Sequence, residues 1–348
     1  MILLQQMLAL FVFMVIGYAM HKKKISDDRS EGMLSWFIVN IANPCLILSG
    51  AVSMEEGMEP QFLGYVFLLS LAMYAGLIIL SYPVVALMRV RPDDIGLFRV
   101  MMVFSNIGFM GVPLLSALYG STALIYGAIF GISFNILLYS WGVLMVSRNV
   151  KKVEVSSSAG EDLTSGSTGE SPVSGELAAE VTAKNGEVSK TPATSPGFLL
   201  RKLVNPGTVA SVITLIIVLS GVQTPTVVDT IVTNLSNTTV SMSMIVIGAS
   251  LAKLPIKEVF TSGKLLIFSV LKLLVIPILV LLIVRNYVND EMLQSVFLIM
   301  VSTPVAALST MLAKENGGNE HVAAGAVAVT TVFSVLTIPF VSFITGVG

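Results

Sequence analysis

Two stretches of the sequence combine helix-breaking residues with side chains that could bind an anion. SNIGFMGVPLLSALYG (105–120) lies in a long apolar segment and has two glycines and a proline within six residues. STPVAALSTMLAKENGG (302–318) places a hydroxyl pair before a proline in another apolar segment. Glycine and proline interrupt helices, and backbone groups freed in lipid must be satisfied by protein or by a water-filled cavity. In secondary transporters, such breaks mark the substrate site.

The chemistry expected at two such breaks is anion binding. If each helix breaks at its proline, the helix that follows begins near the membrane centre, with a partial positive charge and unpaired N–H groups. Two such ends would form an anion site, with hydroxyl and amide side chains adding hydrogen bonds. The simpler alternative is that the prolines only kink the helices and the glycines only allow close packing. The residues expected to line the site are Ser105, Asn106, Gly108, Gly111, Pro113, Ser302, Thr303 and Pro304.

Lys272 is the one clear charge inside an apolar segment, LLIFSVLKLLVIPILVLLIV (265–284). It lies about ten residues into its helix, or roughly 15 Å deep. Ionisable residues inside a membrane are functional candidates, so Lys272 could be the countercharge of an anionic substrate or a proton-sensitive gate. The alternatives are snorkelling toward the cytoplasm and a structural bond to a carbonyl.

Three amides in apolar segments are candidates for a supporting or ion-binding site. Asn40 and Asn43 lie within one helical turn of each other, beside Pro44, and Asn135 stands in a later segment. These side chains could bind a ligand or an ion. Hydrogen bonding between helices is the simpler interpretation for all three.

Several absences narrow the function. The sequence has no P-loop, which excludes an ATP-driven pump encoded in this chain. It has no intramembrane carboxylate pair and no His/Cys cluster, which argues against an intramembrane hydrolase. We therefore expect a transporter rather than an enzyme, with no metal and no cofactor other than a coupling ion, H⁺ or Na⁺. The single cysteine, Cys45, excludes an intrachain disulfide.

The composition is that of an integral membrane protein. Hydrophobic residues make up 54% of the 348 residues and charged residues only 12%, whereas soluble proteins have about 25% charged residues. Apolar runs of roughly 20 residues, the length of a membrane span, occur ten times. The predicted spans are about 2–20, 32–53, 61–88, 98–119, 122–147, 205–222, 227–252, 264–285, 292–313 and 322–346.

The basic residues predict the orientation of these spans. Taking the loops alternately, 18 of the 20 basic residues fall on one side, and only Lys272 and Arg285 do not. Basic loops face the cytoplasm, which places both termini outside, on the extracellular or periplasmic face of the plasma (inner) membrane. A wrong number of spans would have scrambled this alternation.

A polar segment divides the chain into two halves. Residues 149–198 are rich in Ser, Gly, Thr, Glu and Pro, and we expect a disordered cytoplasmic linker there. The flanking regions, 1–148 and 199–348, each hold five predicted spans, so the second half enters the membrane from the opposite side. Two proline pairs support an inverted repeat: Pro113 and Pro304 are 191 positions apart, and Pro83 and Pro277 are 194 apart.

The sequence resembles the auxin efflux carrier family. The residues that carry the resemblance are the stretches 105–120 and 302–318, with IANPCLIL (41–48) and IGASLAKLP (247–255) in support. It covers the whole chain except the linker. The family includes plant auxin carriers and bacterial permeases for dicarboxylates such as malate and malonate. The central segment here is short and of low complexity, which favours the prokaryotic members and argues against auxin itself.

The resemblance implies an all-α fold shared with bile-acid sodium symporters, with ten transmembrane helices in two inverted five-helix repeats. The first, second, sixth and seventh helices would form a scaffold. Helices 3–5 and 8–10 would form a moving transport domain, in which helices 4 and 9 cross at Pro113 and Pro304. Asn106 would lie near the substrate.

The function expected from these observations is alternating-access transport of a small organic anion such as malate, malonate or an auxin-like acid. The alternatives are a sodium-coupled bile-acid-type symporter and a channel or sensor of the same fold. The expected partners are the organic anion, the lipid bilayer and a second copy of the chain in a homodimer. No nucleic acid is expected to bind.

Overall fold

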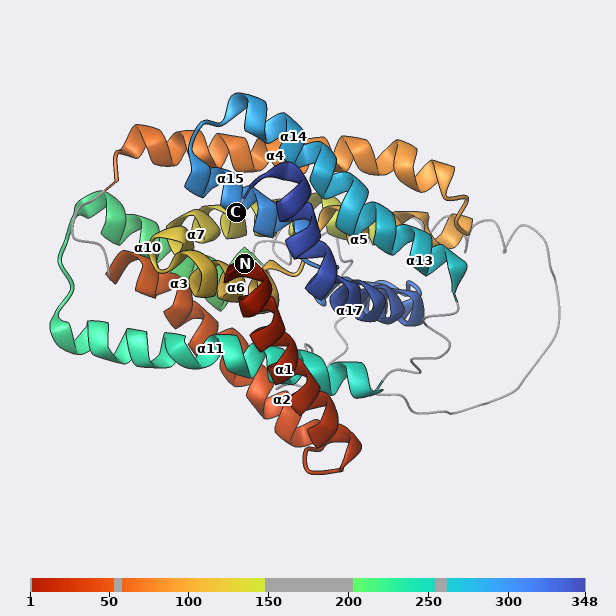
Figure 1. The fold of residues 1–348 in the computed structure, drawn as a ribbon, viewed down its shortest axis with the longest axis horizontal. Coiled ribbons are helices and arrows are strands. Elements are labelled where there is room, and N and C mark those ends of the chain that lie inside the picture. Colours follow the sequence, from red (N-terminus) through yellow and green to blue (C-terminus); the bar gives the residue numbers. More distant parts are fainter. Residues whose placement is uncertain (1, 53–57, 148–202, 254–261, 348) are drawn as a thin grey trace.

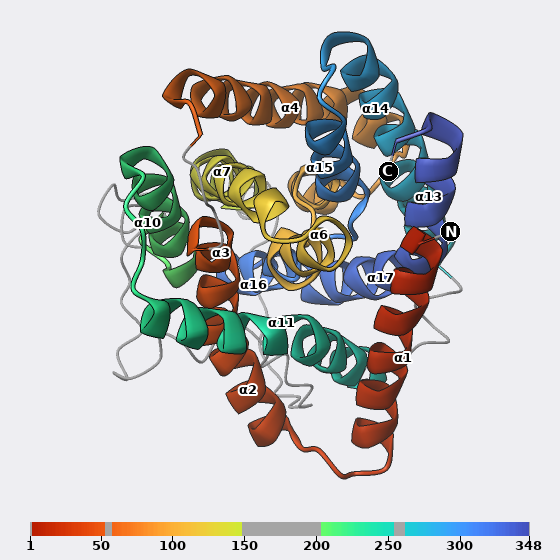
Figure 2. The ribbon, with the colours of Figure 1, turned by 60° about the vertical axis from the view of Figure 1, so that its left-hand side comes forward.

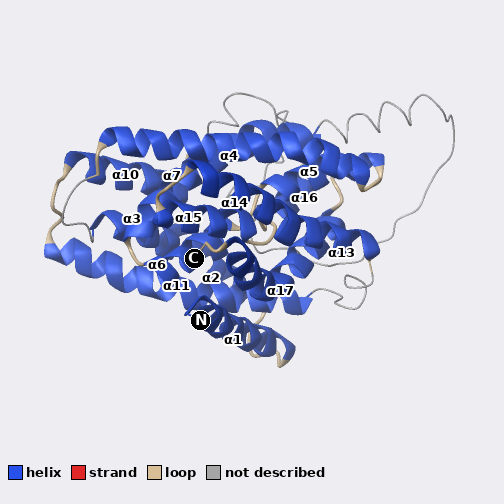
Figure 3. Cartoon of the chain, turned by 45° about the horizontal axis from the view of Figure 1, so that its top comes forward, coloured by secondary structure: helices blue, strands red, loops and turns tan. Residues whose placement is uncertain are grey.

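The computed structural model describes residues 2–52, 58–147, 203–253 and 262–347. These residues form helices joined by short loops, and within these ranges the only β feature is an isolated bridge (Figures 1 and 3). The all-α prediction is therefore confirmed for the described part of the chain. The predicted linker, 149–198, lies outside the described residues.

Both halves of the chain consist of helices in the described ranges. The first half contains α1 (Ile2–Lys22), α2 (Asp28–Phe37), η1 (Ile38–Ala42), α3 (Asn43–Val52), α4 (Pro60–Leu87), η2 (Pro92–Asp94), α5 (Ile95–Val103), η3 (Ile107–Gly111), α6 (Val112–Tyr119), α7 (Thr122–Leu137) and η4 (Leu138–Gly142). The second half contains α10 (Pro206–Ser220), α11 (Thr226–Lys253), α13 (Gly263–Val270), η5 (Leu271–Val275), α14 (Ile276–Tyr287), α15 (Glu291–Ser302), α16 (Leu308–Glu315) and α17 (Glu320–Thr345).

In the ranges that the structure describes, six helices are long and apolar enough to cross a membrane. Of the other four predicted spans, 2–20 forms the continuous helix α1, 205–222 contains the shorter helix α10, and 98–119 and 292–313 are divided by breaks, as described below. The ten-span inverted topology stays a prediction. The six helices are Asp28–Val52, Pro60–Leu87, Thr122–Ser147, Thr226–Lys253, Gly263–Tyr287 and Glu320–Thr345.

A π-turn precedes three of the prolines that lie inside continuous helical segments. Pro44, Pro113 and Pro277 are each the second residue after a five-residue π-helix, η1, η3 or η5. Proline lacks an N–H and its ring clashes with the carbonyl four residues earlier. The wider π-turn contains that carbonyl, so the helix continues past the proline without a break.

Helices from the two halves pack reciprocally. α1 packs along α11, and α3 packs on α10, so each half contributes one member to each pair (Figure 2). Glycines allow the first pair to approach closely. A Cβ on Gly17 would lie 2.0 Å from the Ile245 carbonyl oxygen, and one on Gly248 would lie 1.9 Å from that of Met14. The backbones of α1 and α11 are therefore in direct contact at two points.

Candidate functional site

Two helices are interrupted in the interior of the protein. α5 ends at Val103, the next residue Phe104 has an extended backbone, and η3 begins after Asn106. α15 ends at Ser302, the next residue Thr303 is also extended, and α16 begins at Leu308. Pro304 explains the second end, because the residue before a proline is pushed out of the helical region.

The two breaks cross and satisfy each other's backbone groups. The Asn106 N–H donates to the Pro304 carbonyl at 2.7 Å, and the Ala306 N–H donates to the Phe104 carbonyl at 3.1 Å. Between them, Ser105 and Val305 form an isolated antiparallel bridge. We name residues 104–106 and 303–307 the crossover. It lets two broken helices persist in an apolar interior, because unpaired backbone groups would be costly there.

The prediction that the first helix breaks at Pro113 is wrong. Pro113 lies at the second position of α6, and the break is at Phe104–Asn106, several residues earlier. The preceding π-turn tolerates the proline. Consequently Pro113 and Pro304 are not equivalent, and their 191-residue spacing does not measure the repeat. Pro304 itself lies in the crossover, as predicted.

Asn106 caps the helix that follows the first break. Its side-chain oxygen accepts from the Phe109 N–H at 3.3 Å, and its backbone carbonyl accepts from Met110 and Gly111. At the other break, the N–H groups of Ser309 and Thr310 bond to nearby carbonyls. The expectation of open N–H groups at both helix starts is therefore only partly met. The dipoles of these helices still point their positive ends toward the crossover.

Lys272 reaches the crossover from η5 and is fully buried. Its ammonium donates to the Met102 carbonyl at 2.9 Å and to the Ser105 hydroxyl at 2.8 Å. Snorkelling is thereby excluded, and a bond to a carbonyl is present. Met102 lies in the last turn of α5, where the helix dipole is negative and a cation is stabilising.

Among the described residues, no carboxylate lies within ion-pair distance of Lys272; the ion pairs that the structure describes are at the distant cluster of His21, Asp28, Glu31 and Lys253. Protein surrounds Lys272 on all sides. In this conformation the ammonium contacts the crossover only through the Met102 carbonyl and the Ser105 hydroxyl among the hydrogen bonds that the structure describes.

Ser302 and Thr303 end α15 beside the crossover. Both are fully buried, and their hydroxyl oxygens have no hydrogen-bond partner in the described part of the protein. Buried polar groups are normally paired, so these two hydroxyls are available to a bound water or ligand.

The glycines of η3 occupy different surroundings. A Cβ on Gly108 would come no closer than 3.8 Å to the Asn43 amide nitrogen, so Asn43 and Gly108 face each other across the boundary between α3 and η3. The Asn43 amide oxygen is buried and has no hydrogen-bond partner in the described ranges. Gly111 meets mainly Ile107 of its own helix. Gly108 therefore lies beside the candidate residue Asn43, and Gly111 lies beside the carbonyl of Asn106.

The other two amides have partners away from the crossover. Asn40 donates to the Trp36 carbonyl of its own helix at 2.8 Å. Asn135 donates to the Thr208 hydroxyl at 2.9 Å and joins α7 to α10. The Asn135 bond supplies the helix-packing role that was the simpler interpretation, whereas the Asn40 bond does not join two helices.

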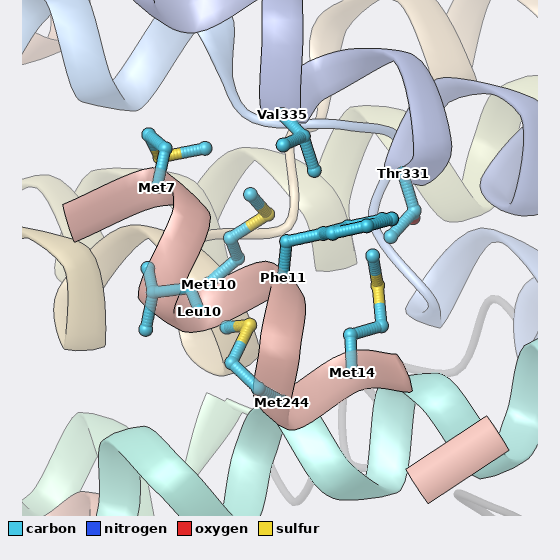
Figure 4. A pocket seen from close by; sticks show the side chains of 8 residues that line it. All are labelled: Met7, Leu10, Phe11, Met14, Met110, Met244, Thr331 and Val335. Carbon is cyan, nitrogen blue, oxygen red and sulfur yellow. The ribbon is translucent and has the colours of Figure 1, made fainter. Parts of the chain in front are cut away.

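An apolar pocket lies beside η3 (Figure 4). Met110 of η3 faces it, and Ser334 of α17 places its hydroxyl 3.8 Å from the Met110 sulfur. Methionines adapt their shape easily to the groups around them. Thr331 supplies the single hydroxyl of the lining. The lining residues are Met7, Leu10, Phe11, Met14, Met110, Met244, Thr331 and Val335.

Sequence reasoning missed two contributors to the crossover. The Met102 carbonyl binds Lys272, and the Thr330 hydroxyl accepts from the Val305 N–H at 3.1 Å. A backbone carbonyl carries no sequence signal. The hydroxyl pair Thr330–Thr331 in an apolar helix was the signal that could have pointed to α17.

The family model described as "Membrane transport protein" matches residues 2–342, nearly the whole chain. No curated protein matches the chain. The match, together with the apolar helices and the crossed breaks, agrees with the resemblance carried by the two quoted stretches. The chain therefore belongs to the auxin efflux carrier family of membrane transport proteins.

Proposed function

We propose that this membrane transporter carries a small organic anion, a carboxylate, by alternating access at the crossover. The observation that carries the proposal is Lys272, a fully buried ammonium with no described carboxylate partner. A membrane protein retains such a costly group where it serves function.

The charges around the crossover favour an anion. Each helix end there contributes a partial charge of about half an elementary charge, positive at the two helix starts and negative at the two helix ends. These four partial charges nearly cancel. The proposal takes Lys272 to be protonated, so its charge is the one that remains and the field at the crossover is positive. In an interior of low dielectric constant this field attracts an anion strongly.

Hydrogen-bond donors for a carboxylate are present in the same region. The hydroxyls of Ser302 and Thr303 are buried beside the crossover and have no described acceptor. A hydroxyl donates well to an ionised oxygen, and such charge-assisted bonds are about twice as strong as neutral ones. Malate, malonate and auxin-like acids all offer the required carboxylate.

The helix packing supports a division into a scaffold and a moving domain. α1, α3, α10 and α11 pack on one another, with backbone contact at Gly17 and Gly248. α15, α16 and the α13–α14 helix all pack against α17. The Met-rich pocket is lined by both groups, from α1 and α11 on one side and η3 and α17 on the other. In this proposal the second group slides along the first and exposes the crossover alternately to each side.

The test is uptake of labelled mono- and dicarboxylates into proteoliposomes. We expect saturable uptake of at least one acid, reduced by Lys272→Met and by Asn106→Ala. The matched control, Ser140→Ala, removes an exposed hydroxyl that bonds only to its own helix and should transport normally. Uptake unaffected by Lys272→Met and Asn106→Ala would overturn the assignment of these residues, and channel-like currents would overturn alternating access.

A further inference from the structure

We infer that the Lys272 ammonium is a resident cation of the crossover, in the place where other transporters with broken helices bind a coupling ion. Anion transport by this chain would then need no Na⁺. The inference rests on the proposed function, because it specifies how the anion site obtains its positive charge.

Two oxygens hold the Lys272 ammonium. They are a backbone carbonyl in the last turn of α5 and the hydroxyl of Ser105 in the break that follows. In transporters with discontinuous helices, freed carbonyls and half-helix C-terminal ends are the groups that coordinate Na⁺. Both oxygens here are occupied by an N–H donor.

Lys272 is firmly held in this position. Its side chain is completely buried. Lys272 belongs to the π-turn η5, which ends two residues before Pro277. Protein surrounds the ammonium, so a Na⁺ ion has no room at the same oxygens. Repulsion between two unit charges a few ångströms apart would oppose it further.

The lysine also determines how much charge moves in each transport cycle. A bound Na⁺ can leave with the substrate, but a lysine stays with the protein. With Lys272 protonated, the crossover itself carries one positive charge when empty and none when loaded with a monovalent anion. Each cycle moves only the charge of the substrate, and the membrane potential should drive it.

The experiment compares the wild type with two variants in proteoliposomes containing either Na⁺ or N-methylglucamine, with the membrane potential clamped. Wild-type carboxylate uptake should be equal in the two salts. Lys272→Ala leaves a space between the Met102 and Ser105 oxygens, and uptake should fall roughly tenfold or more, the loss expected for a hydrogen bond to a charged group. Na⁺ or ethylammonium should partly restore it. Lys272→Met fills the space without a charge and should not respond to either cation.

A second readout separates this inference from the proposed function. Na⁺ or ethylammonium should raise the unfolding temperature of purified Lys272→Ala, but not that of the wild type or of Lys272→Met. Lys264→Ala is the control, because Lys264 is exposed on the same helix and bonds to the Arg89 carbonyl.

Each outcome decides one of the two claims. Carboxylate uptake that requires Na⁺ in the wild type would overturn the inference and leave the proposed function standing. Lys272→Ala that neither responds to cations in stability nor loses uptake would also overturn it. A wild type that transports no carboxylate would overturn the proposed function, and the cation-dependent stability of Lys272→Ala would still test the cation site. If Lys272→Ala folds only when a cation is present, the inference is supported.

Discussion

The hydrogen bond between Lys272 and Ser105 joins two residues that are 167 positions apart and come from opposite halves of the chain. Lys272 also bonds to the Met102 carbonyl, so a single ammonium holds the end of α5 and the start of the first break. The proposed anion site depends on a buried charge whose position is fixed by these two oxygens. Removing either the charge or the hydroxyl should change transport more than folding.

Ser105→Ala tests this arrangement without removing the lysine. The variant keeps the Met102 bond and loses the hydroxyl, so the ammonium is held less firmly. Losing a hydrogen bond to a charged group costs about 1.5–3 kcal/mol. We expect carboxylate uptake to fall at least tenfold in proteoliposomes while the unfolding temperature drops only slightly. Uptake equal to that of Ser140→Ala would contradict a role for Ser105.

At the scale of helices, the decisive feature is where each broken helix ends. α15 stops because Pro304 follows Thr303. α5 stops without a proline, and Asn106 caps the helix that follows. The sequence predicted the second break correctly and misplaced the first, because it assigned the break to Pro113 rather than to an asparagine cap. A π-turn that accommodates a proline has no recognised residue pattern, which is why the error arose.

Two proline variants test whether Pro304, and not Pro113, determines the shape of the crossover. Pro304→Ala removes the residue that stops α15, so the helix can extend and the Asn106 N–H loses its acceptor. We expect it to lose most carboxylate uptake. Pro113→Ala changes only the second residue of α6, where a proline is tolerated but not required, and should retain uptake. Equal losses in the two variants, measured in the same proteoliposome assay, would show that Pro113 also shapes the crossover.

The contact between α1 and α11 predicts a strong effect of small substitutions. Gly17→Ala places a methyl group 2.0 Å from the Ile245 carbonyl oxygen, and backbone must move to accommodate it. Overpacking typically costs about 1–3 kcal/mol and can cost more. We expect a clear drop in the unfolding temperature of the purified protein. Gly76→Ala is the control, since nothing lies within 4 Å of its added Cβ, and equal stability of the two variants would refute the close contact.

At the scale of the whole molecule, loops that the charge pattern places on one side of the membrane contact one another in pairs. Lys253 at the end of α11 pairs with Asp28 and Glu31 at 2.5 and 2.9 Å, and His21 lies 2.8 Å from Glu31. These contacts join loops that follow the first and seventh predicted spans.

The N- and C-terminal ends of the described chain lie close together in three views (Figures 1–3).

Further contacts link other basic loops. Lys264 donates to the Arg89 carbonyl at 3.3 Å, and Ser147 donates to the Asn316 amide oxygen at 2.7 Å. Arg285, the basic residue outside the pattern, instead bonds to the Thr345 carbonyl near the C-terminus. The loop contacts agree with the predicted alternation, and the side of the membrane that each end faces stays a prediction.

Labelling with a membrane-impermeant maleimide tests the predicted orientation in a Cys45→Ala background. Lys23→Cys and Asp93→Cys should react only from the cytoplasmic side, and Val222→Cys and Asn289→Cys only from outside. All four positions are exposed in the structure. Labelling of Lys23→Cys and Val222→Cys from the same side would contradict the ten-span topology.

The sequence was most informative about features set by local pattern. Apolar runs and basic loops located the helices, because span length and charge bias are local properties. The partners of Lys272 could not be predicted, because Met102 is 170 positions away and contributes only a backbone carbonyl. The bond of Asn135 to Thr208 likewise depends on tertiary packing. Local sequence identified the candidate residues, but their arrangement required the fold.

The central claim is that the buried charge of Lys272 makes the crossover an anion site. Carboxylate-induced charge displacement, recorded from reconstituted protein on a solid-supported membrane, measures this most directly. The wild type should give a saturable transient of the sign expected for an entering anion, unchanged when Na⁺ is replaced by N-methylglucamine. Lys272→Met should give a transient roughly tenfold smaller or more at the same carboxylate concentration. A transient of wild-type size in Lys272→Met would contradict the claim that the charge of Lys272 makes the crossover an anion site.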